Sequence, residues 1–402
     1  MKIIYLSHRI PFPADKGEKI RTFHQLKYLV SKGYDITVFS PVSDDNEIQF
    51  AKALAKELPL RVQTSQLGAA WLRKIKGLLN QQALSVSHFH TANLARQLEA
   101  AVRHTPPDAI VCTSSAMAGY VEPLIQQKII PASCRLLMDY IDLDSDKWQQ
   151  YASKAHWPMR WLYQREAKLI AEAELSAHSA FDHCFFISEN ETNLFCARGA
   201  ATAKVSVLAN GIDTGEFYSS HKALNNQAPV FLFTGVMDYL PNEDAVLWFV
   251  KSCWQQVLQQ WPEARFIIAG MQPSQKIQQL ARIEGITVTG YVNDILPYYH
   301  QADIFIAPFR LARGVQNKIL QAMACGIPVI TTTLGAEGIA CRHGEHLLLA
   351  DDEQEILSQI TAVLTNPDLY SALQQAGPAL IQEKYSWEGA LQALPALLTG
   401  NR

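Results

Sequence analysis

The chain has 402 residues, of which 48% are hydrophobic and 18% charged, and 35 basic against 38 acidic residues give a net charge of −3. At about 150 residues per domain, this length predicts two to three domains. The composition favours packed cores over a disordered chain. The near-neutral charge argues against a protein that coats nucleic acid by neutralising phosphates.

The cysteines and the hydropathy pattern restrict the class further. Seven cysteines with no C-x-x-C pair indicate neither a disulfide framework nor a zinc ribbon. No stretch approaches the roughly 18 apolar residues of a membrane-spanning helix, and His8 and Arg9 interrupt the first apolar run. We therefore expect no signal peptide, no membrane anchor and a cytoplasmic protein.

The first half of the chain alternates short apolar runs with helical periodicity. Strands are expected at residues 2–7, 34–40, 109–114, 135–141 and 182–188, and helices over 20–30 and 160–177. Gly33 is placed to end the first helix. This alternation predicts a doubly wound parallel sheet.

A second series follows the polar stretch 210–227. Strands are expected at 230–235, 264–270, 286–290, 302–308 and 327–332, and helices over 244–260, 277–284 and 317–325. A last helix over 385–398 should follow a break at Pro378 and cross back to the first domain. We expect a first Rossmann-like domain at 1–207, a second at 208–380, and the terminal helix in 381–402.

The turns that follow the strands are the places to search for a site, because ligands of open parallel sheets bind at the carboxyl ends of the strands. In the first such turn, Gly17 precedes a helix start that carries Lys19 and Arg21, an arrangement suited to an anion. A proline-rich surface loop with a solvated basic helix face explains it equally well.

The turn after the strand at 135–141 carries four aspartates, at positions 139, 142, 144 and 146. Such a group could bind a metal, act as a base, or cap a helix through Asp144 or Ser145. Asp142 stands where the strand should end, so it is the best candidate to face a cleft. A metal site is disfavoured because no His or further carboxylate lies at ligand spacing.

Two turns of the second half carry stronger signals. Gly235 closes a strand and is followed by Asp238 and Tyr239, which helix-start chemistry does not explain. Further on, three cations gather around Gly314 just before a helix that begins near Asn317: Arg310, Arg313 and Lys318. Several cations beside a helix N-terminus are what a diphosphate group requires.

Seven ordered segments carry a family resemblance: HRIPFPADKGEKIRTFH, DYIDLDSDKWQQYA, FISENET, LANGIDTGEF, FTGVMDYLPNEDAV, GYVNDILPYYHQADIFIAPFR and RGVQNKILQAMACGIPVI. On these the chain resembles the GT-B glycosyltransferases of family 4, and more closely the sugar transferases of PEP-CTERM/exosortase exopolysaccharide systems. The resemblance covers nearly the whole chain.

The resemblance implies an α/β GT-B fold, in which two Rossmann-like domains with parallel sheets face a central cleft. It implies sugar transfer with retention of configuration, no metal, and no cofactor beyond the nucleotide diphosphate sugar donor. Basic side chains and a helix N-terminus then have to neutralise the leaving diphosphate. The implied donor-side residues are Gly235, Asp238, Tyr239, Tyr291, Val292, Gly314, Gln316, Asn317, Lys318 and Gln321.

The chain departs from the family pattern at three positions. Arg313 and Gln321 occupy the two ends of the family's Glu-x7-Glu pattern, and Ile141 stands where the family has His. A glutamine carbonyl accepts one ribose hydrogen bond but lacks the charge of Glu, which predicts weaker donor binding. Because the family's His is absent, the resemblance implies for the neighbouring Asp142 only that its polar side chain faces the cleft.

The leading hypothesis is a retaining glycosyltransferase that acts on an exopolysaccharide acceptor, lipid-linked in the family pattern, with catalytic roles for Asp142, Arg313 and Lys318. The alternatives are a weakened family member that serves as a binding subunit, and a GT-B nucleotide-sugar epimerase. Residues 69–80 and 157–165 mix aromatics with cations, which suggests peripheral contact with the inner face of the cytoplasmic membrane. Ordinary packing helices would show the same pattern.

Overall fold

The computed structural model describes residues 1–15, 17–71, 73, 77, 82–220, 222–312 and 314–400, apart from the side chain of Lys154. The chain forms two compact units, the first comprising residues 1–210 with the C-terminal segment from Ala390, and the second residues 211–389. No helix in the described ranges is both long and apolar enough to span a membrane.

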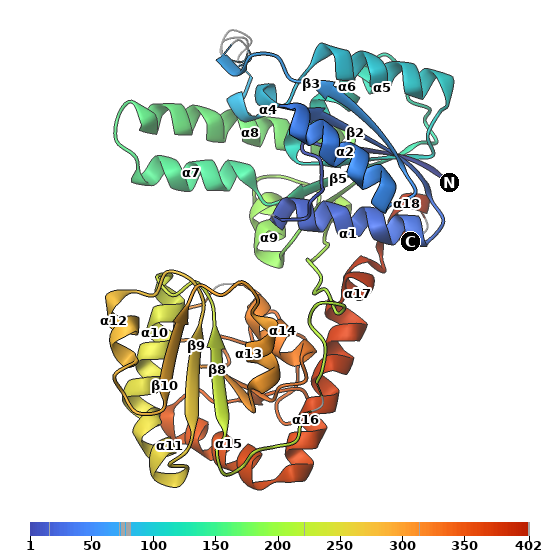
Figure 1. The fold of residues 1–402 in the computed structure, drawn as a ribbon. Coiled ribbons are helices and arrows are strands. Elements are labelled where there is room, and N and C mark those ends of the chain that lie inside the picture. Colours follow the sequence, from blue (N-terminus) through green and yellow to red (C-terminus); the bar gives the residue numbers. More distant parts are fainter. Residues whose placement is uncertain are drawn as a thin grey trace. The chain divides into compact units, whose positions relative to one another are not determined.

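The first unit is a parallel sheet with helices on its faces (Figure 1). Its seven strands follow the order β3-β2-β1-β4-β5-β6-β7: β1 (Lys2–Ser7), β2 (Asp35–Val42), β3 (Arg61–Gln66), β4 (Ala109–Thr113), β5 (Arg135–Ile141), β6 (His183–Phe186) and β7 (Val205–Val207). The central strands β1, β4 and β5 are almost wholly buried, which is why they appear in the sequence as continuous apolar runs.

The helices of the first unit connect these strands. They are α1 (Gly17–Ser31), α2 (Asp45–Glu57), α4 (Leu84–His88), α5 (Ala92–His104), α6 (Ala118–Gln126), α7 (Asp144–Lys154), α8 (Met159–Ala180), α9 (Glu189–Ala197) and α18 (Leu394–Thr399), with short 3₁₀ turns at Ser115–Met117 and Thr202–Lys204. The segment around α18 belongs to this unit, where Arg135 Nε donates to the Leu397 carbonyl at 3.4 Å.

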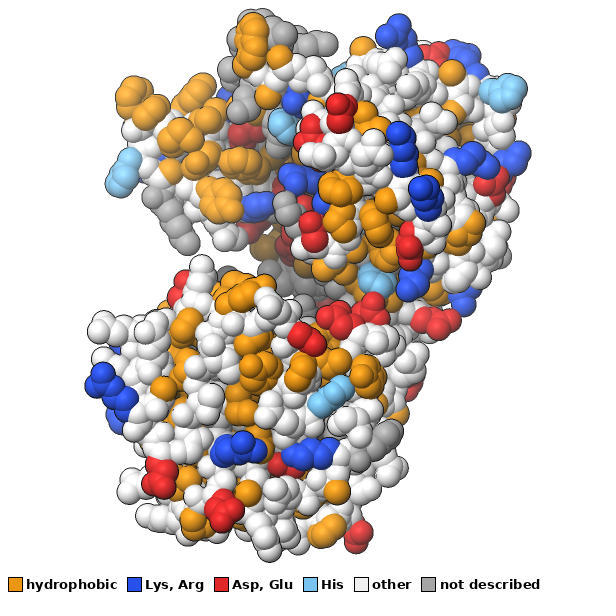
Figure 2. All heavy atoms as spheres, viewed as in Figure 1, with side chains coloured by type: hydrophobic (Ala, Val, Ile, Leu, Met, Phe, Trp, Pro, Cys, Tyr) orange, Lys and Arg blue, Asp and Glu red, His pale blue; other side chains and the backbone are white. Residues whose placement is uncertain are grey.

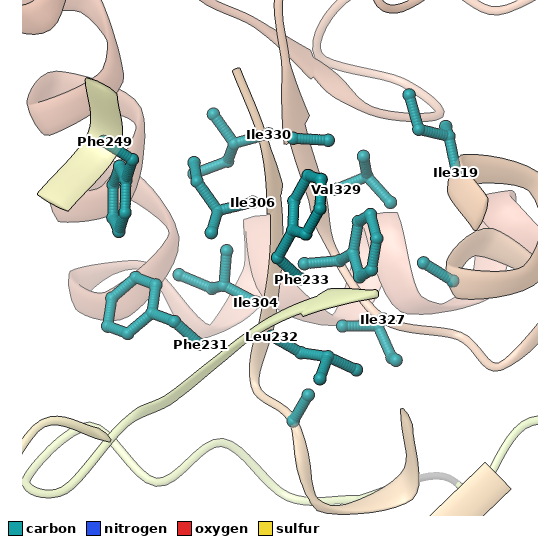
Figure 3. Packing of buried hydrophobic residues seen from close by; sticks show 14 of the residues in the cluster. Phe231, Leu232, Phe233, Phe249, Ile304, Ile306, Ile319, Ile327, Val329 and Ile330 are labelled. Carbon is teal, nitrogen blue, oxygen red and sulfur yellow. The ribbon is translucent and has the colours of Figure 1, made fainter. Parts of the chain in front are cut away.

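The second unit has a six-stranded parallel sheet in the order β10-β9-β8-β11-β12-β13. The strands are β8 (Val230–Thr234), β9 (Arg265–Ala269), β10 (Ile286–Gly290), β11 (Ile304–Ala307), β12 (Val329–Thr331) and β13 (Leu348–Leu349). Phe231 and Phe233 of β8 pack with Ile304 and Ile306 of β11 in the core of this unit (Figure 3).

Helices cover this second sheet as well. They are α10 (Leu240–Phe249), α11 (Gln255–Gln260), α12 (Gln275–Leu280), α13 (Leu296–Gln301), α14 (Asn317–Ala324), α15 (Glu353–Thr365) and α16 (Pro367–Leu380), with π-helical turns at Val250–Trp254 and Ile381–Tyr385. Helix α17 (Trp387–Leu391) spans the boundary at which the chain returns to the first unit. The predicted architecture of two parallel α/β sheets is confirmed.

Two predictions about the C-terminal segment are wrong. Pro378 does not end a helix but lies inside α16, whose face with Leu373, Gly377 and Leu380 is buried. Burial of that face outweighs the hydrogen bond that a proline removes. The expected single helix over 385–398 is two short helices, because Pro395 sits in the first turn of α18 and starts a new helix there.

Candidate functional site

A pocket of about 820 Å³ lies within the second unit, at the carboxyl edge of its sheet. The ends of β8 and β9, the turn after β10, and the N-terminal turns of α10 and α14 all contribute to it. The lining residues are Thr234, Gly235, Val236, Asp238, Tyr239, Asn242, Ala269, Gly270, Met271, Tyr291, Val292, Ile295, Tyr299, Gln316, Asn317, Lys318 and Gln321.

Most of the donor-side residues expected from sequence line this pocket together. They are Gly235, Asp238, Tyr239, Tyr291, Val292, Gln316, Asn317, Lys318 and Gln321. Parallel strands end at one edge of a sheet, so four turns that are distant in the sequence converge there. The pocket also receives the first turns of two helices, where unpaired N–H groups and the helix dipole favour an anion.

Lys318 is the chemically distinctive group of the pocket. Its Nζ donates to Asn242 Oδ1 at 2.5 Å and lies 4.7 Å from the ring centre of Phe233 and 5.3 Å from that of Phe309. None of the described carboxylates forms an ion pair with it. Burial among these groups lowers the pKa of Lys318 to about 7. An anion placed here would restore the charge on this lysine.

Two glycines allow the strand ends to approach closely around this lysine. A Cβ at Gly235 would lie 2.6 Å from Lys318 Nζ and 2.7 Å from Asn242 Nδ2. A Cβ at Gly270 would lie 1.8 Å from the carbonyl oxygen of Gly235. Any larger side chain at either position would push the neighbouring groups out of place, so the shape of the pocket floor depends on both glycines.

Gln321 is held by a buried chain of hydroxyls. Tyr299 OH donates to Gln321 Oε1 at 3.1 Å, and Thr234 Oγ1 lies 2.8 Å from the same hydroxyl. Tyr299 is fully buried, and burial raises the pKa of its hydroxyl, so the proton stays in place. This bond uses one of the two lone pairs of Oε1, so Gln321 can still accept one hydrogen bond and donate through its amide N–H groups.

The other cations expected at this site are placed differently. Arg310 does not line the pocket; its guanidinium binds Asp244 through two bonds of 3.0 and 2.5 Å and lies 5.8 Å from the Trp248 ring centre. Gly314 is exposed outside the lining and has a positive φ of 66°. Arg313 lies outside the described residues, so its assigned role stays a prediction.

In the first unit, Asp142 follows the end of β5 and is exposed. Partial desolvation raises the pKa of its carboxyl, while Lys147 and Arg21 act in the opposite direction. Gly17 is the first residue of α1, and no neighbouring atom lies within 4 Å of a Cβ built on it. No described ligand contact tests either role, and both stay predictions.

The aspartates near β5 have separate functions in the structure. Asp139 is buried and accepts from Arg21 Nε at 2.8 Å and from Gln25 Nε2 at 2.6 Å. Helix capping by Asp144 or Ser145 is wrong, because α7 begins at Asp144 and its cap residue is Leu143. Among the described residues no three His, Cys, Asp or Glu side chains are grouped to hold a metal ion, and metal independence stays a prediction.

Sequence reasoning missed eight of the lining residues, and three of them shape the site: Asn242, Gly270 and Tyr299. Gly270 carried a usable signal, since it directly follows β9 as Gly235 follows β8. Asn242 lies in the first turn of α10 just after Pro241, a usual place for Asn, and its bridge from the Val236 carbonyl to Lys318 appears only in the structure. Tyr299 lies in one of the quoted segments, but nothing in that segment singles it out from its neighbour Tyr298.

All of the pocket lining falls within residues 228–366, which match the family described as glycosyl transferases group 1. The match therefore lies wholly within the second unit, the unit that holds the pocket.

Two further similarities extend over nearly the whole chain, and a third covers part of it. It is 23% identical over 396 residues to an uncharacterized 44.6 kDa protein in the cps region of Klebsiella pneumoniae, covering 96% of each protein. A segment of 127 residues is 24% identical to the Vi polysaccharide biosynthesis protein VipC/TviE of Salmonella typhi, covering 30% of this chain and 22% of that protein. Alr3699/HepE of Anabaena, solved in complex with UDP, matches with a TM-score of 0.63 at 15% identity over 100% of both chains. Together with the two parallel sheets, the structural likeness shows a GT-B fold.

Proposed function

We propose that the chain is a retaining glycosyltransferase that transfers a sugar from a nucleoside diphosphate sugar to a saccharide acceptor. The observation that carries this proposal is Lys318, a half-buried lysine that pairs with none of the described carboxylates, beside the N-terminal turns of α10 and α14. A partly desolvated amine in this setting gains most from an anionic ligand. The match of the same residues to a glycosyl transferases group 1 domain supports the nucleotide-sugar assignment.

The pocket's chemistry fits a leaving diphosphate. When the bond from the anomeric carbon to the diphosphate oxygen breaks, negative charge develops on that oxygen. Lys318 and the N–H groups of the helix starts would bind the developing charge, and we propose that no metal ion takes part. Asn242 holds the ammonium group in position from its other side.

The remaining lining residues suggest how the rest of the donor binds. Tyr291 is 68% exposed beside Val292, and we assign these two to the nucleotide base. Gln321 is assigned to the ribose, and Asp238 with Tyr239 to the diphosphate or sugar. The UDP bound to the Anabaena protein supports UDP as the first nucleotide to test.

The acceptor is proposed from the relatives and from the motifs. Similarity to proteins of the Klebsiella cps region and of Vi polysaccharide biosynthesis supports a growing polysaccharide. The resemblance to exosortase-associated sugar transferases supports a lipid-linked acceptor, with Asp142 on the acceptor side. The first unit would then hold the acceptor.

Calorimetry with a panel of UDP-, GDP- and ADP-sugars tests the donor assignment, with Lys318→Gln as the matched variant. We expect one nucleotide class to bind the native chain and to lose affinity in the variant. Equal affinities in both proteins would contradict the diphosphate role of Lys318.

Turnover assays with the donor that binds separate the alternatives. Transfer to a saccharide acceptor, with the donor's anomeric configuration kept in the product, supports the proposal. Binding without turnover on any candidate acceptor would favour a binding subunit. Release of an epimerised sugar nucleotide without an acceptor would favour an epimerase.

A further inference from the structure

Helices α7 and α8 form an antiparallel hairpin that projects from the first unit (Figure 1). Every buried residue of α8 lies at or after Glu166, where the helix packs against the rest of the unit. From residue 155 to residue 165, here called the hairpin tip, no residue is buried. The tip therefore contributes nothing to the core of its own unit, and its composition needs another explanation.

The hairpin tip is apolar where a solvated turn would be polar. Trp157 is 83% exposed, Trp161 59% and Met159 43%. Figure 2 shows hydrophobic side chains gathered over the two helices. An exposed apolar group of this kind marks an interaction surface, because isolated large residues on a surface are ordinary but a contiguous set is not.

Aromatic packing fixes the base of the tip. The Trp148 ring lies 5.8 Å from that of Tyr151 and 5.4 Å from that of Tyr163, which joins α7 to α8. The two helices are thereby held together just behind the exposed tryptophans. The tip is presented on a stable support, and docking does not require it to fold.

The charge of the hairpin indicates which kind of partner it can bind. The sequence from Lys147 to Arg165 contains four basic residues and no acidic one. Lys147 and Arg165 pair with acids at the base, Asp144 at 3.7 Å and Glu166 at 2.9 Å. Arg160 is exposed, and no described acidic side chain pairs with it. The tip therefore presents positive charge among tryptophans.

We propose that the hairpin tip docks the first unit onto an anionic lipid surface, with Trp157 and Trp161 in the headgroup region and Arg160 on the lipid phosphates. Tryptophan has an apolar body and a polar N–H, which suits the interface between hydrocarbon and water. Arginine can keep its head at the phosphates while its stem lies along apolar surface. A narrow projecting tip suits insertion between headgroups better than it suits burial against a folded partner, which requires a broad complementary face.

Vesicle flotation of the full chain tests this inference without any donor or acceptor, so its outcome is independent of the proposed activity. We expect binding to vesicles that contain phosphatidylglycerol, and a loss of roughly tenfold or more in the partition coefficient for Trp157→Ala/Trp161→Ala. Arg160→Gln should weaken binding to these vesicles by about fivefold and leave binding to pure phosphatidylcholine unchanged. Since none of the three residues is buried, the variants should keep the native unfolding temperature.

Trp71→Ala is the matched control, because Trp71 is 62% exposed in the other aromatic and basic segment, most of which lies outside the described residues. This variant should bind vesicles as the native chain does. Three results would overturn the proposal: no binding of the native chain to phosphatidylglycerol vesicles, full binding by the double tryptophan variant, or loss of binding in Trp71→Ala. Self-association that the double variant abolishes, without vesicle binding, would assign the tip to protein contacts.

Discussion

Each unit holds a desolvated cation near the carboxyl edge of its sheet, Arg21 fully buried and Lys318 half-buried, and the two differ in what surrounds them. In the first unit Arg21 is fully buried and donates to both carboxylate oxygens of Asp139, at 2.8 and 3.0 Å, and to Asn210 at 3.0 Å. In the second unit Lys318 has one amide oxygen and two aromatic rings around it. The first cation is neutralised by the protein, whereas the second is not.

This difference distinguishes a cation that stabilises the fold from a cation that remains available to bind a ligand. A buried ion pair with its hydrogen bonds satisfied has no remaining capacity for a ligand. Desolvation without a counter-ion makes the charged form of an amine less stable, and the pKa of Lys318 is lowered for this reason. From the sequence, the basic residues after the first strand suggest an anion site. In the structure, Arg21 instead stabilises the fold through its ion pair with Asp139.

The largest effect should come from breaking the structural pair. Asp139→Asn removes the charge opposite Arg21 and should lower the free energy of unfolding by about 3 to 5 kcal/mol, as measured by denaturant titration. The double variant Arg21→Met/Asp139→Leu removes both charges and should recover most of that loss. If the double variant is as unstable as the single one, packing around the pair matters more than its charge.

The next largest effect should appear at the binding cation. Lys318→Gln should weaken nucleotide-sugar binding by roughly a hundredfold, or about 2.7 kcal/mol, because the diphosphate loses its only cationic partner among the described lining residues.

The pH dependence gives this prediction a second readout. Below a pH of about 7 Lys318 is charged in the free site, so affinity should be constant; above it, binding must take up a proton and affinity should fall as pH rises. Calorimetry in buffers of different ionisation enthalpy measures this proton uptake. Lys318→Arg keeps its charge and should give a flat profile, and a sloping profile in that variant would assign the titration to another group.

The pocket floor should be less sensitive than the cation. Gly235→Ala places a Cβ against Lys318 Nζ and Asn242 Nδ2 and should weaken nucleotide binding by roughly tenfold through their displacement. Gly344→Ala is the matched control, since Gly344 also has a positive φ, 76°, but no atom lies within 4 Å of its added Cβ. Equal binding losses in the two variants would indicate backbone strain and not crowding of the lysine.

Many of the strands could be predicted from the sequence because they are buried on both faces. The predicted residues 2–7 and 135–141 coincide with β1 and β5, which contain almost only buried side chains. The short edge strand β3 was missed because its residues, RVQTSQ, are mostly polar and partly exposed. An edge strand needs neither a continuous apolar run nor a strong β pattern.

In the candidate site, too, some residues could be predicted from the sequence and others could not. Turn residues such as Gly235, Asn317 and Lys318 could be predicted because glycine, helix-start and cation signals coincide at strand ends. Partners that lie on helices or are distant in the sequence could not. The contact between Lys318 and Asn242 spans 76 positions, and that between Tyr299 and Gln321 spans 22, so no local pattern encodes them.

The smallest effect concerns Gln321, and it tests whether this position meets the ribose. In Gln321→Glu one carboxylate oxygen can still accept from Tyr299 OH, and the other can accept from a ribose hydroxyl in a charge-assisted bond about twice as strong as a neutral one. Nucleoside diphosphate affinity, measured by calorimetry, should rise about threefold to tenfold. The gain should vanish for a dideoxyribose analogue, which has no hydroxyl to donate. If the gain persists with the analogue, the new carboxylate acts through Lys318 and not through the sugar. An unchanged affinity for both ligands would remove Gln321 from the ribose site altogether.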